Sequence, residues 1–477
     1  MPSLPRLVGS SAFWLAVVCA LFLAAQLVLF DLERPLDWDE AVYLSETYAG
    51  VEPVGYSAHR SRGIILLVAP IAVLGPPVWL VRLFLALGSG AAMFAALFTW
   101  RRALGAALPV AALLFGSSWL TLLYGSEISP NLWSALGAVA ATGMMAEFFR
   151  EPTRWRLAAF VVLLAAVGVI RPVDATVIGG ATGVLVLAYR PTAWKAAALS
   201  VASAGLLGWL PWVAEAVIMW GGIRERLASA QSAFGEGVPG NIFMHHLRLT
   251  DGPLMGPDTT LDLPTAGVIW WFVLASLAAA SVGVCRSGTE RRGAVLAVAT
   301  GGGAAAFYLL FPGALAPRFL LPAYALLSVA AALGMRAMTR RWSKPRQVAL
   351  LAVIGAAALI PWQLWNVYTA TQIETSQVEA RSQGEILGTI LRAQAAGGDC
   401  AFASQYGWPQ IQFYSGCRGR RYVRGTEPPF NDADLASKFV VALIPPDDIA
   451  LSSERWYGEE VQHPKLSGWF LYRPQDM

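Results

Sequence analysis

The stretch that decides the fold is Ser11–Phe30, SAFWLAVVCALFLAAQLVLF, followed closely by the acidic turn Asp37-Trp38-Asp39-Glu40. Twenty residues without a formal charge are long enough for one helix to cross the hydrocarbon core of a bilayer. The acidic turn is therefore delivered to a membrane surface. Because ionisable side chains at a membrane are costly and usually functional, we expect this turn to take part in the function.

The whole chain has the composition of an integral membrane protein. Of its 477 residues, 56% are hydrophobic and 14% are charged, and the mean hydropathy is +0.52. These values exclude a string of soluble domains. The net charge is only +4 and basic residues gather at the ends of apolar segments, which argues against a nucleic-acid partner. Abundant Ala and Gly, with Arg far outnumbering Lys, indicate a GC-rich bacterial genome. Together with the apolar composition, this leads us to expect a multi-pass protein of a bacterial plasma membrane.

Basic and acidic loops alternate along the chain, which predicts a mainly α, polytopic helical bundle. Placing every Arg-rich loop in the cytoplasm gives eleven crossings, with the amino terminus inside and the tail after residue 370 outside. The first run is expected to be a retained helix, because no Ala-x-Ala cleavage site precedes Asp31. The expected spans are 11–30, 78–100, 104–123, 130–149, 157–171, 174–189, 196–219, 263–285, 294–313, 318–335 and 348–369.

Two regions are too short or too charged for ordinary spans. Ile64–Gly75 has twelve mostly apolar residues, so we expect it to lie along the outer interface within the first external loop, 31–77. The short segments 157–171 and 174–189 meet at Arg171-Pro172-Val173-Asp174. This charged corner is expected near the outer surface or a wet cavity, because charges that face lipid are costly.

The composition changes sharply after residue 369, which predicts a membrane domain, 1–369, and an extracytoplasmic domain, 370–477. The second is expected to be a small α/β or α+β domain with a helix over 374–395 and strands at 400–404, 439–444 and 469–472. Cys400 and Cys417 lie in it, seventeen positions apart. In an oxidising compartment they would form a disulfide that contributes about 3 kcal/mol. In the cytoplasm they would be two free thiols.

Asp39-Glu40-Ala41-Val42-Tyr43, directly after the first span, resembles the opening signature of the GT-C membrane glycosyltransferases. The similarity is to the branch of the protein O-mannosyltransferases and the lipid A aminoarabinose transferase. Three further features follow in the family's order: a short interfacial element over 59–75, Glu127 at the start of the fourth span, and Pro317-Arg318-Phe319-Leu320-Leu321-Pro322. The chain departs from the family at His59-Arg60-Ser61-Arg62-Gly63, where relatives often show Lys-Pro-Pro.

The resemblance implies an inverting transfer of a mannose- or arabinose-type sugar from a polyprenyl-phosphate donor. The acceptor would be a hydroxyl of a glycan, a protein or a small molecule at the outer face of the membrane. By match to the family, Asp39 would be the catalytic base, with Glu40 as its companion. Asp37 and Tyr43 would contact substrate. The alternative for these residues is an ordinary solvated acidic loop.

Other polar residues suit the donor. Glu127 and Asn131 are expected to share a helix face with Ser134, where they would contact the sugar or the acceptor. The alternative is that Glu127 only stabilises the helix, as a negative charge at the positive end of the helix dipole. Arginine offers phosphate a bidentate fork, and Arg318 is the best match to the family motif. Arg171 either binds phosphate or pairs with Asp174. The four phosphate candidates are Arg60, Arg62, Arg171 and Arg318.

Adjacent histidines, His245-His246, point apart and have no carboxylate at ligand spacing, so we expect neither a zinc site nor another cofactor. Two other functions compete with the transferase. A transporter or lipid flippase would place ionisable residues at mid-span and show paired repeats. A lipid-linked polymer ligase or polymerase would carry its large external loop late in the chain. The distinctive charges of this sequence lie at outer span ends instead, which favours the transferase.

Overall fold

The computed structural model describes residues 10–232, 266–286, 288–310, 316–341 and 345–422, and in the tail residues 428–431, 434, 437, 439–445, 451 and 455–475. These residues form two compact units, each assembled from separate parts of the chain. The first unit comprises residues up to 30, 57–64 and 82–373. The second comprises 31–56, 65–81 and the chain from 374 onward. The predicted division at residue 369 into a membrane domain and a tail domain stays a prediction.

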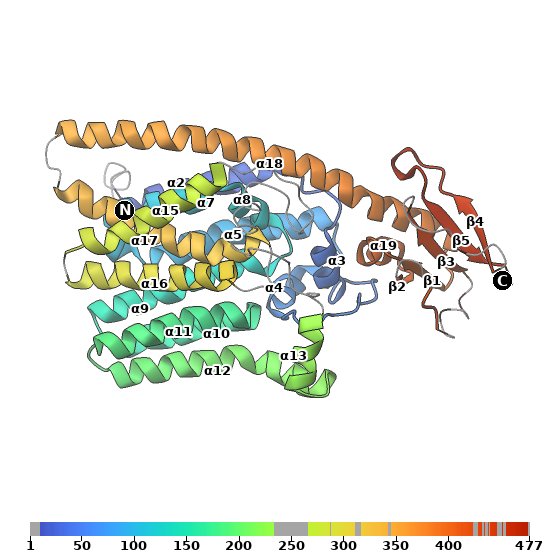
Figure 1. The fold of residues 1–477 in the computed structure, drawn as a ribbon, viewed down its shortest axis with the longest axis horizontal. Coiled ribbons are helices and arrows are strands. Elements are labelled where there is room, and N and C mark those ends of the chain that lie inside the picture. The colour runs from blue at the N-terminus through green and yellow to red at the C-terminus, as the bar shows by residue number, and fades with distance from the viewer. Residues whose placement is uncertain are drawn as a thin grey trace. The chain divides into compact units, whose positions relative to one another are not determined.

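The first unit is a helical bundle (Figure 1). Its helices, two of which also extend into the second unit, are α2 (Ser11–Leu29), α5 (Val78–Phe98), α6 (Arg101–Leu104), η1 (Gly105–Ala107), α7 (Leu108–Gly116), α8 (Trp119–Ser126), α9 (Pro130–Arg150), α10 (Arg154–Ile170), α11 (Pro172–Tyr189), α12 (Trp194–Met219), α13 (Ile223–Ser232), α15 (Ala266–Val284), α16 (Gly288–Leu310), η2 (Pro317–Leu320), α17 (Leu321–Arg341) and α18 (Pro345–Ala395).

Many of these helices are long and apolar enough to cross a membrane, which confirms a mainly helical, multi-pass fold. Among the described residues seven helices meet that standard, and an eighth span results if one bent pair is counted. The seven are α2, α5, α9, α11, α12, α16 and the stretch that joins η2 to α17. The total of eleven crossings and the direction of each stay predictions.

Within the expected span 104–123 the chain bends by 80°, between α7 and α8. Ser117 ends α7, and Ser118 has the extended backbone of a helix N-cap. The amide N–H of Trp119 then donates to Asn366 Oδ1 at 2.8 Å. A side chain thus satisfies a donor that the break would otherwise leave exposed to lipid.

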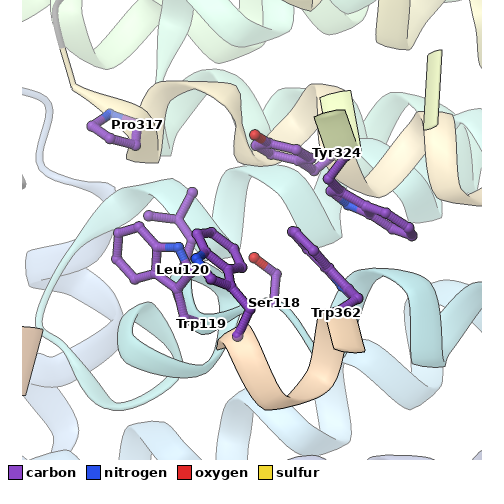
Figure 2. Close-up of a pocket in the computed structure, with 8 residues that line it drawn as sticks. Ser118, Trp119, Leu120, Pro317, Tyr324 and Trp362 are labelled. Atoms are coloured by element: carbon purple, nitrogen blue, oxygen red, sulfur yellow. The ribbon is translucent and has the colours of Figure 1, made fainter. Parts of the chain in front are cut away.

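An aromatic hollow lies at this break (Figure 2). The indole rings of Trp270 and Trp362 stack with their centroids 4.4 Å apart, and Trp365 stacks on Trp362 at 5.0 Å. Figure 2 shows Pro317 and Tyr324 lying across the hollow from Trp119 and Leu120. The hollow is therefore built from residues of α8, α15, η2, α17 and α18.

Small residues bring the helices of the bundle into close contact. α10 packs against both α9 and α12, and these helices run side by side in Figure 1. At the crossing of α10 and α12, a Cβ added to Gly168 would lie 2.5 Å from the Gly208 Cα atom. Such close backbone approach is the usual way in which helices associate in lipid.

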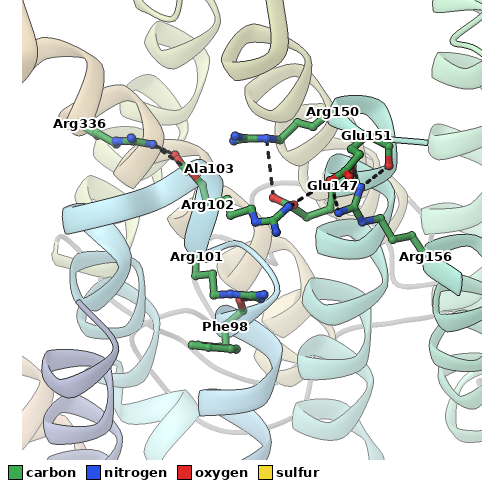
Figure 3. A network of polar contacts seen from close by, with 9 residues as sticks. All are labelled: Phe98, Arg101, Arg102, Ala103, Glu147, Arg150, Glu151, Arg156 and Arg336. Carbon is green, nitrogen blue, oxygen red and sulfur yellow. Dashed lines mark hydrogen bonds and ion pairs between the residues drawn. The ribbon is translucent and has the colours of Figure 1, made fainter. Parts of the chain in front are cut away.

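The Arg-rich loops end in a network of ion pairs that joins α6, α9, α10 and α17 (Figure 3). Arg102 contacts Glu147 and Glu151, each at 3.3 Å. Arg156 binds Glu151 at 2.7 Å, and its hydrogen bond and charge hold the pKa of the Glu151 carboxyl below its usual range. From α17, Arg336 donates to the Ala103 carbonyl. The arginines on which the topology prediction rests therefore also hold helix ends together.

The second unit contains a five-stranded sheet with the order β2-β1-β3-β5-β4. Its strands are β1 (Cys400–Ser404), β2 (Arg418–Arg421), β3 (Phe439–Ile444), β4 (Trp456–Glu460) and β5 (Phe470–Pro474). β1 pairs in parallel with β2 and β3, whereas β5 pairs antiparallel with β3 and β4. Buried residues of β1 and β3, such as Phe402 and Val441, form a hydrophobic core with residues of α18 and of the helix over Trp408–Ser415. The small mixed sheet confirms the predicted class of the tail.

One helix, α18, extends through the predicted boundary between last span and tail. It has 51 residues, from Pro345 to Ala395, where the sequence predicts a span over 348–369 and a separate helix over 374–395. No Gly or Pro occurs between Pro361 and Gly384, so nothing interrupts the helical hydrogen bonds at residue 370.

Candidate functional site

The acidic turn lies in the second unit, at the start of α3 (Trp38–Ser45). Asp37 is the helix N-cap, with extended backbone, and its amide N–H donates to Glu40 Oε2 at 3.0 Å. A Glu at the third helical position that reaches back to the N-cap is a standard device for starting a helix. Asp39 lies between these two residues, in the first helical turn, and is partly exposed.

Glu40 is 1% exposed, unlike Asp37 and Asp39. Its Oε2 atom accepts from the guanidinium of Arg381, on α18, at 3.4 Å. The same guanidinium lies 4.0 Å from Asp37 Oδ1. This geometry favours a structural role for Glu40, which leaves Asp39 as the better candidate for a base.

The second unit also supplies the surroundings of the turn. α19 (Trp408–Ser415) packs against α3, and the Trp38 and Trp408 rings meet edge to face at 5.8 Å. The Leu36 amide N–H donates to the Tyr414 hydroxyl at 2.9 Å. Tyr43, the aromatic residue of the family signature, is 5% exposed and lies against Tyr56, with ring centroids 6.4 Å apart.

A second polar group, in the first unit, surrounds Arg171 at the junction of α10 and α11. Its guanidinium donates to Asn131 Oδ1 at 2.7 Å and to the Tyr308 hydroxyl at 3.0 Å. It also pairs with Asp174 Oδ2 at 3.2 Å. Asp174 is 3% exposed and accepts hydrogen bonds from Ser134, at 2.5 Å, and from Tyr308. The structural alternative for Arg171, a pair with Asp174, is therefore present.

Arg318 lies beside this group, in η2. It is 7% exposed and donates to the Tyr124 hydroxyl at 3.4 Å. The Phe319 ring is shared by two guanidiniums, that of Arg318 at 5.4 Å and that of Arg171 at 4.6 Å. The structure thus brings together two of the four arginines that the sequence offers for phosphate. Pro317, next to Arg318, also lines the aromatic hollow (Figure 2).

Glu127 and Asn131 lie in the same region, where α8 ends and α9 begins. Both are 2% exposed. The Oδ1 atom of Asn131 is taken by Arg171, and its buried Nδ2 atom has no hydrogen-bond partner among the described residues. The cluster around Arg171 therefore includes the Asp174 carboxylate and the buried amide donor of Asn131. Glu127 ends α8 with extended backbone and lies before α9, so the prediction that it shares a helix face with Asn131 and Ser134 is wrong.

The other two arginines, Arg60 and Arg62, belong to a separate part of the first unit. Arg60 donates to Ser57 Oγ at 2.8 Å and is 7% exposed. Arg62 pairs with Glu215 Oε1, in α12, at 2.6 Å. Since Arg62 is already engaged in this ion pair, it is a weaker candidate for phosphate.

Sequence reasoning missed Arg226, a fully buried residue that fixes this segment. Its guanidinium donates to the carbonyls of Ala58 and Arg60, each at 3.0 Å, and pairs with Glu215 Oε2 at 2.7 Å. It also lies 4.3 Å from the centroid of the Trp212 ring. Glu215 is an acidic residue within an apolar span, and that signal in the sequence points to a buried cation.

Cys400 and Cys417 form a disulfide that joins β1 to the end of the α19 segment. Among the described residues, no group of three or more His, Cys, Asp or Glu side chains is arranged to hold a metal ion. His245-His246 lie outside the described residues, and the expectation of no zinc site stays a prediction.

No protein-family profile matches the sequence, and no curated protein matches it. Solved structures match its fold at low sequence identity. ArnT from Cupriavidus metallidurans bound to undecaprenyl phosphate is 13% identical, with a TM-score of 0.66 over 96% of this chain and 97% of that one. The apo state of that protein gives a TM-score of 0.63 at 14% identity, over 91% and 93% of the two chains.

A third similar structure is the archaeal oligosaccharyltransferase AglB from Archaeoglobus fulgidus, in complex with an inhibitory peptide and a dolichol-phosphate. It is 13% identical, with a TM-score of 0.52 over 85% of this chain and 64% of that one. Both proteins are GT-C glycosyltransferases. The resemblance that the sequence motifs predict is confirmed in three dimensions, and the chain has the fold of the GT-C glycosyltransferases.

Proposed function

We propose that this protein is a membrane glycosyltransferase that moves a sugar from a polyprenyl-phosphate donor to a hydroxyl acceptor. The observation that carries the proposal is the likeness of nearly the whole chain to ArnT, in a structure that holds undecaprenyl phosphate. The order of the sequence motifs supports the same function. The sugar is of the mannose or arabinose type, and the reaction takes place at the outer face of a bacterial plasma membrane.

The reaction is a single displacement that inverts the anomeric carbon. The acceptor oxygen forms a bond to that carbon while the bond from carbon to the phosphate oxygen breaks. Asp39 takes the proton of the acceptor hydroxyl, because it is the partly exposed carboxylate at the start of α3 that matches the family's base. The lipid phosphate leaves with its pair of electrons.

Arg318 stabilises the departing phosphate in this proposal. A guanidinium donates two parallel hydrogen bonds to phosphate oxygens and neutralises part of their charge. Arg171 shares the Phe319 ring with Arg318, but Asp174 already compensates its charge. Arg171 therefore orients Asn131, and Arg318, the arginine that matches the family motif, binds the phosphate.

The partners of the protein are then a polyprenyl-phosphate sugar in the bilayer and an acceptor outside it. The acceptor is a glycan, a protein or a small molecule with a free hydroxyl. Glu127 and the buried amide of Asn131 are suited to hydroxyl groups of the transferred sugar, since one accepts and the other donates hydrogen bonds.

The test is purified protein in proteoliposomes, supplied with a panel of polyprenyl-phosphate sugars and hydroxyl acceptors. Release of polyprenyl phosphate together with inverted glycoside product supports the proposal. Movement of labelled lipid between leaflets, with no sugar transferred from any donor of the panel, contradicts it and identifies a flippase instead. Glu52→Gln is the control variant for every kinetic comparison. It changes an exposed carboxylate in the external loop that also carries Asp39.

A further inference from the structure

One guanidinium from the carboxyl-terminal part of the chain holds both carboxylates that flank Asp39. Arg381 lies on α18, 341 positions after Glu40. Its Nη1 atom donates to Glu40 Oε2 at 3.4 Å, and its Nε atom lies 4.0 Å from Asp37 Oδ1. The side chains of Arg381 and Glu40 are 3% and 1% exposed, so water competes little for this contact.

The two ends of this contact are themselves fixed. Glu40 Oε2 also accepts from the Asp37 amide N–H at 3.0 Å, so one oxygen joins the start of α3 to Arg381. On the other side, Arg381 Nε donates to Gln377 Oε1, one turn earlier on α18, at 3.2 Å. The guanidinium is thereby held to its own helix, and α3 is held to the guanidinium.

The burial of this pair has an energetic consequence. A buried carboxylate whose cation is removed retains the cost of desolvation without its compensation. Without Arg381, we expect Glu40 either to take up a proton or to move toward water. Each change alters the turn on which Asp39 lies, because Glu40 is the residue after Asp39 and closes the first turn of α3.

We propose that Arg381 is a positioning residue for transfer: it fixes the acidic turn so that the Asp39 carboxylate meets the acceptor hydroxyl. The proposal rests on the proposed function, since it takes Asp39 as the base. A general base works only within hydrogen-bond reach of the proton it removes. Displacement of a reacting group by about 1 Å costs on the order of 10²-fold in rate. Arg381 touches neither substrate nor reacting atoms in this account, and acts through Glu40 and Asp37.

The experiment compares Arg381→Ala and Arg381→Lys with Arg392→Ala, which removes an exposed arginine from the same helix. Hydrogen–deuterium exchange of the full-length protein in nanodiscs reports on residues 31–45, and transfer kinetics report on function. Arg381→Ala should raise exchange in 38–45 and lower kcat by roughly 10²-fold, with the donor KM changed by less than about twofold, since the phosphate contacts remain. Arg381→Lys should recover part of both effects. Arg392→Ala should change neither.

A second variant covers the case in which Arg381→Ala does not fold. Glu40→Gln keeps an oxygen for the Asp37 amide but removes the charge, so it should show the same exchange and kcat effects in milder form. Where Arg381→Ala does fold, adding Glu40→Gln to it should lower kcat little further, because both act through one contact.

The exchange measurement alone can overturn the inference, without any substrate. Unchanged exchange in 38–45 for both Arg381→Ala and Glu40→Gln overturns it. Raised exchange with an unchanged kcat overturns it as well, because the turn is then held for stability alone. If the wild type transfers no sugar from any donor, the proposed function fails and the positioning role fails with it. The exchange result still shows whether Arg381 holds the turn.

Discussion

Asp39 is the residue on which the proposed chemistry depends most directly. Its neighbours Asp37 and Glu40 both contact Arg381, and Glu40 is buried, so the three carboxylates of the turn are not equivalent. We expect Asp39→Asn to lower kcat by about 10²–10⁴-fold, because an amide cannot accept the proton of the acceptor hydroxyl. The measurement is steady-state transfer by purified protein at matched expression.

The control for this prediction is Glu52→Gln, which should retain wild-type turnover. An Asp39→Asn protein that transfers sugar at the wild-type rate would remove Asp39 from the mechanism. A loss of the same size in Asp37→Asn would instead indicate that the whole turn has been disturbed.

Arg318 tests the other half of the reaction, the leaving phosphate. Arg318→Ala should weaken the use of donor by roughly 10- to 100-fold in kcat/KM and leave the acceptor KM nearly unchanged, because a charged hydrogen bond is worth about 1.5–3 kcal/mol. Arg318→Lys keeps the charge but loses the bidentate guanidinium, so its kcat/KM for the donor should lie between those of the wild type and Arg318→Ala. The measurement is a titration of each substrate in turn. Collapse of acceptor binding with unchanged donor use would show that the phosphate lies elsewhere.

At the scale of elements, the crossing of α10 and α12 depends on two glycines. A Cβ on Gly208 would lie 2.9 Å from Gly168 Cα and 3.2 Å from the Ala165 carbonyl oxygen, so Gly208→Ala must separate the helices. We expect it to destabilise the protein by about 1–3 kcal/mol. Gly205→Ala, one turn earlier on α12, meets nothing within 4 Å and is the matched control. Thermal unfolding in detergent distinguishes them, and equal melting temperatures would contradict the close-packed crossing.

We expect the stability of the second unit to depend on pH through Asp434. Its burial acts to raise the pKa, but the hydrogen bond from Arg420, the Asn431 amide and the charges of Arg420 and Arg418 outweigh that effect and lower it. A lowered folded-state pKa contributes stability above the unfolded value of about 3.9, and that stability is lost as the pH falls through the folded pKa. Asp434→Asn should therefore lower the melting temperature at pH 7, and should lower it by less near pH 3.

Full-length protein in detergent, melted at several pH values with tryptophan emission as the signal, is the measurement for Asp434. Arg473→Gln, which changes an exposed charge of β5, should show no such pH dependence. If Asp434→Asn lowers the melting temperature equally at both pH values, the loss comes from packing, and the charge of Asp434 is not its cause.

The elements that the sequence predicts well are those with a strong local signal. Apolar runs and Arg-rich ends locate α2, α9, α11 and α12, and short, nearly continuous apolar runs locate β1 and β3. β2 and β4 escape prediction because Arg418-Gly-Arg-Arg and Trp456-Tyr-Gly-Glu-Glu are polar edge strands, whose partners alone make them strands. The bend at Ser117-Ser118 depends on Asn366, which no local pattern connects to it.

The site follows the same rule. The family resemblance predicts Asp39 and Arg318, and Arg171 stands out because it ends an apolar run. The burial of Glu40, and the roles of Arg226 and Arg381, depend on contacts between residues far apart in the chain. Glu215 carries the one local signal that was available, a carboxylate within an apolar helix.

At the scale of the whole molecule, charge alternation predicts that the tail lies on the outer side of the membrane. There, an oxidising compartment favours the Cys400–Cys417 disulfide. In sealed right-side-out vesicles, a membrane-impermeant maleimide should label these cysteines only after reduction. Cys19 and Cys285 are free but buried. Replacing both by Ser ensures that any labelling comes from Cys400 and Cys417. Labelling of Cys400 from the cytoplasmic side without reductant would overturn both the topology and the compartment of the reaction.

The second unit is assembled from three stretches of chain, 31–56, 65–81 and 374 onward. The tail is therefore not a module that can be exchanged by a cut at one point. A chimera that takes residues 374–477 from a homologue inherits new versions of Arg381, Trp408 and Tyr414 but keeps the old 31–56, and the two were never selected together. Grafting a foreign tail would require all three stretches to be transplanted as one piece.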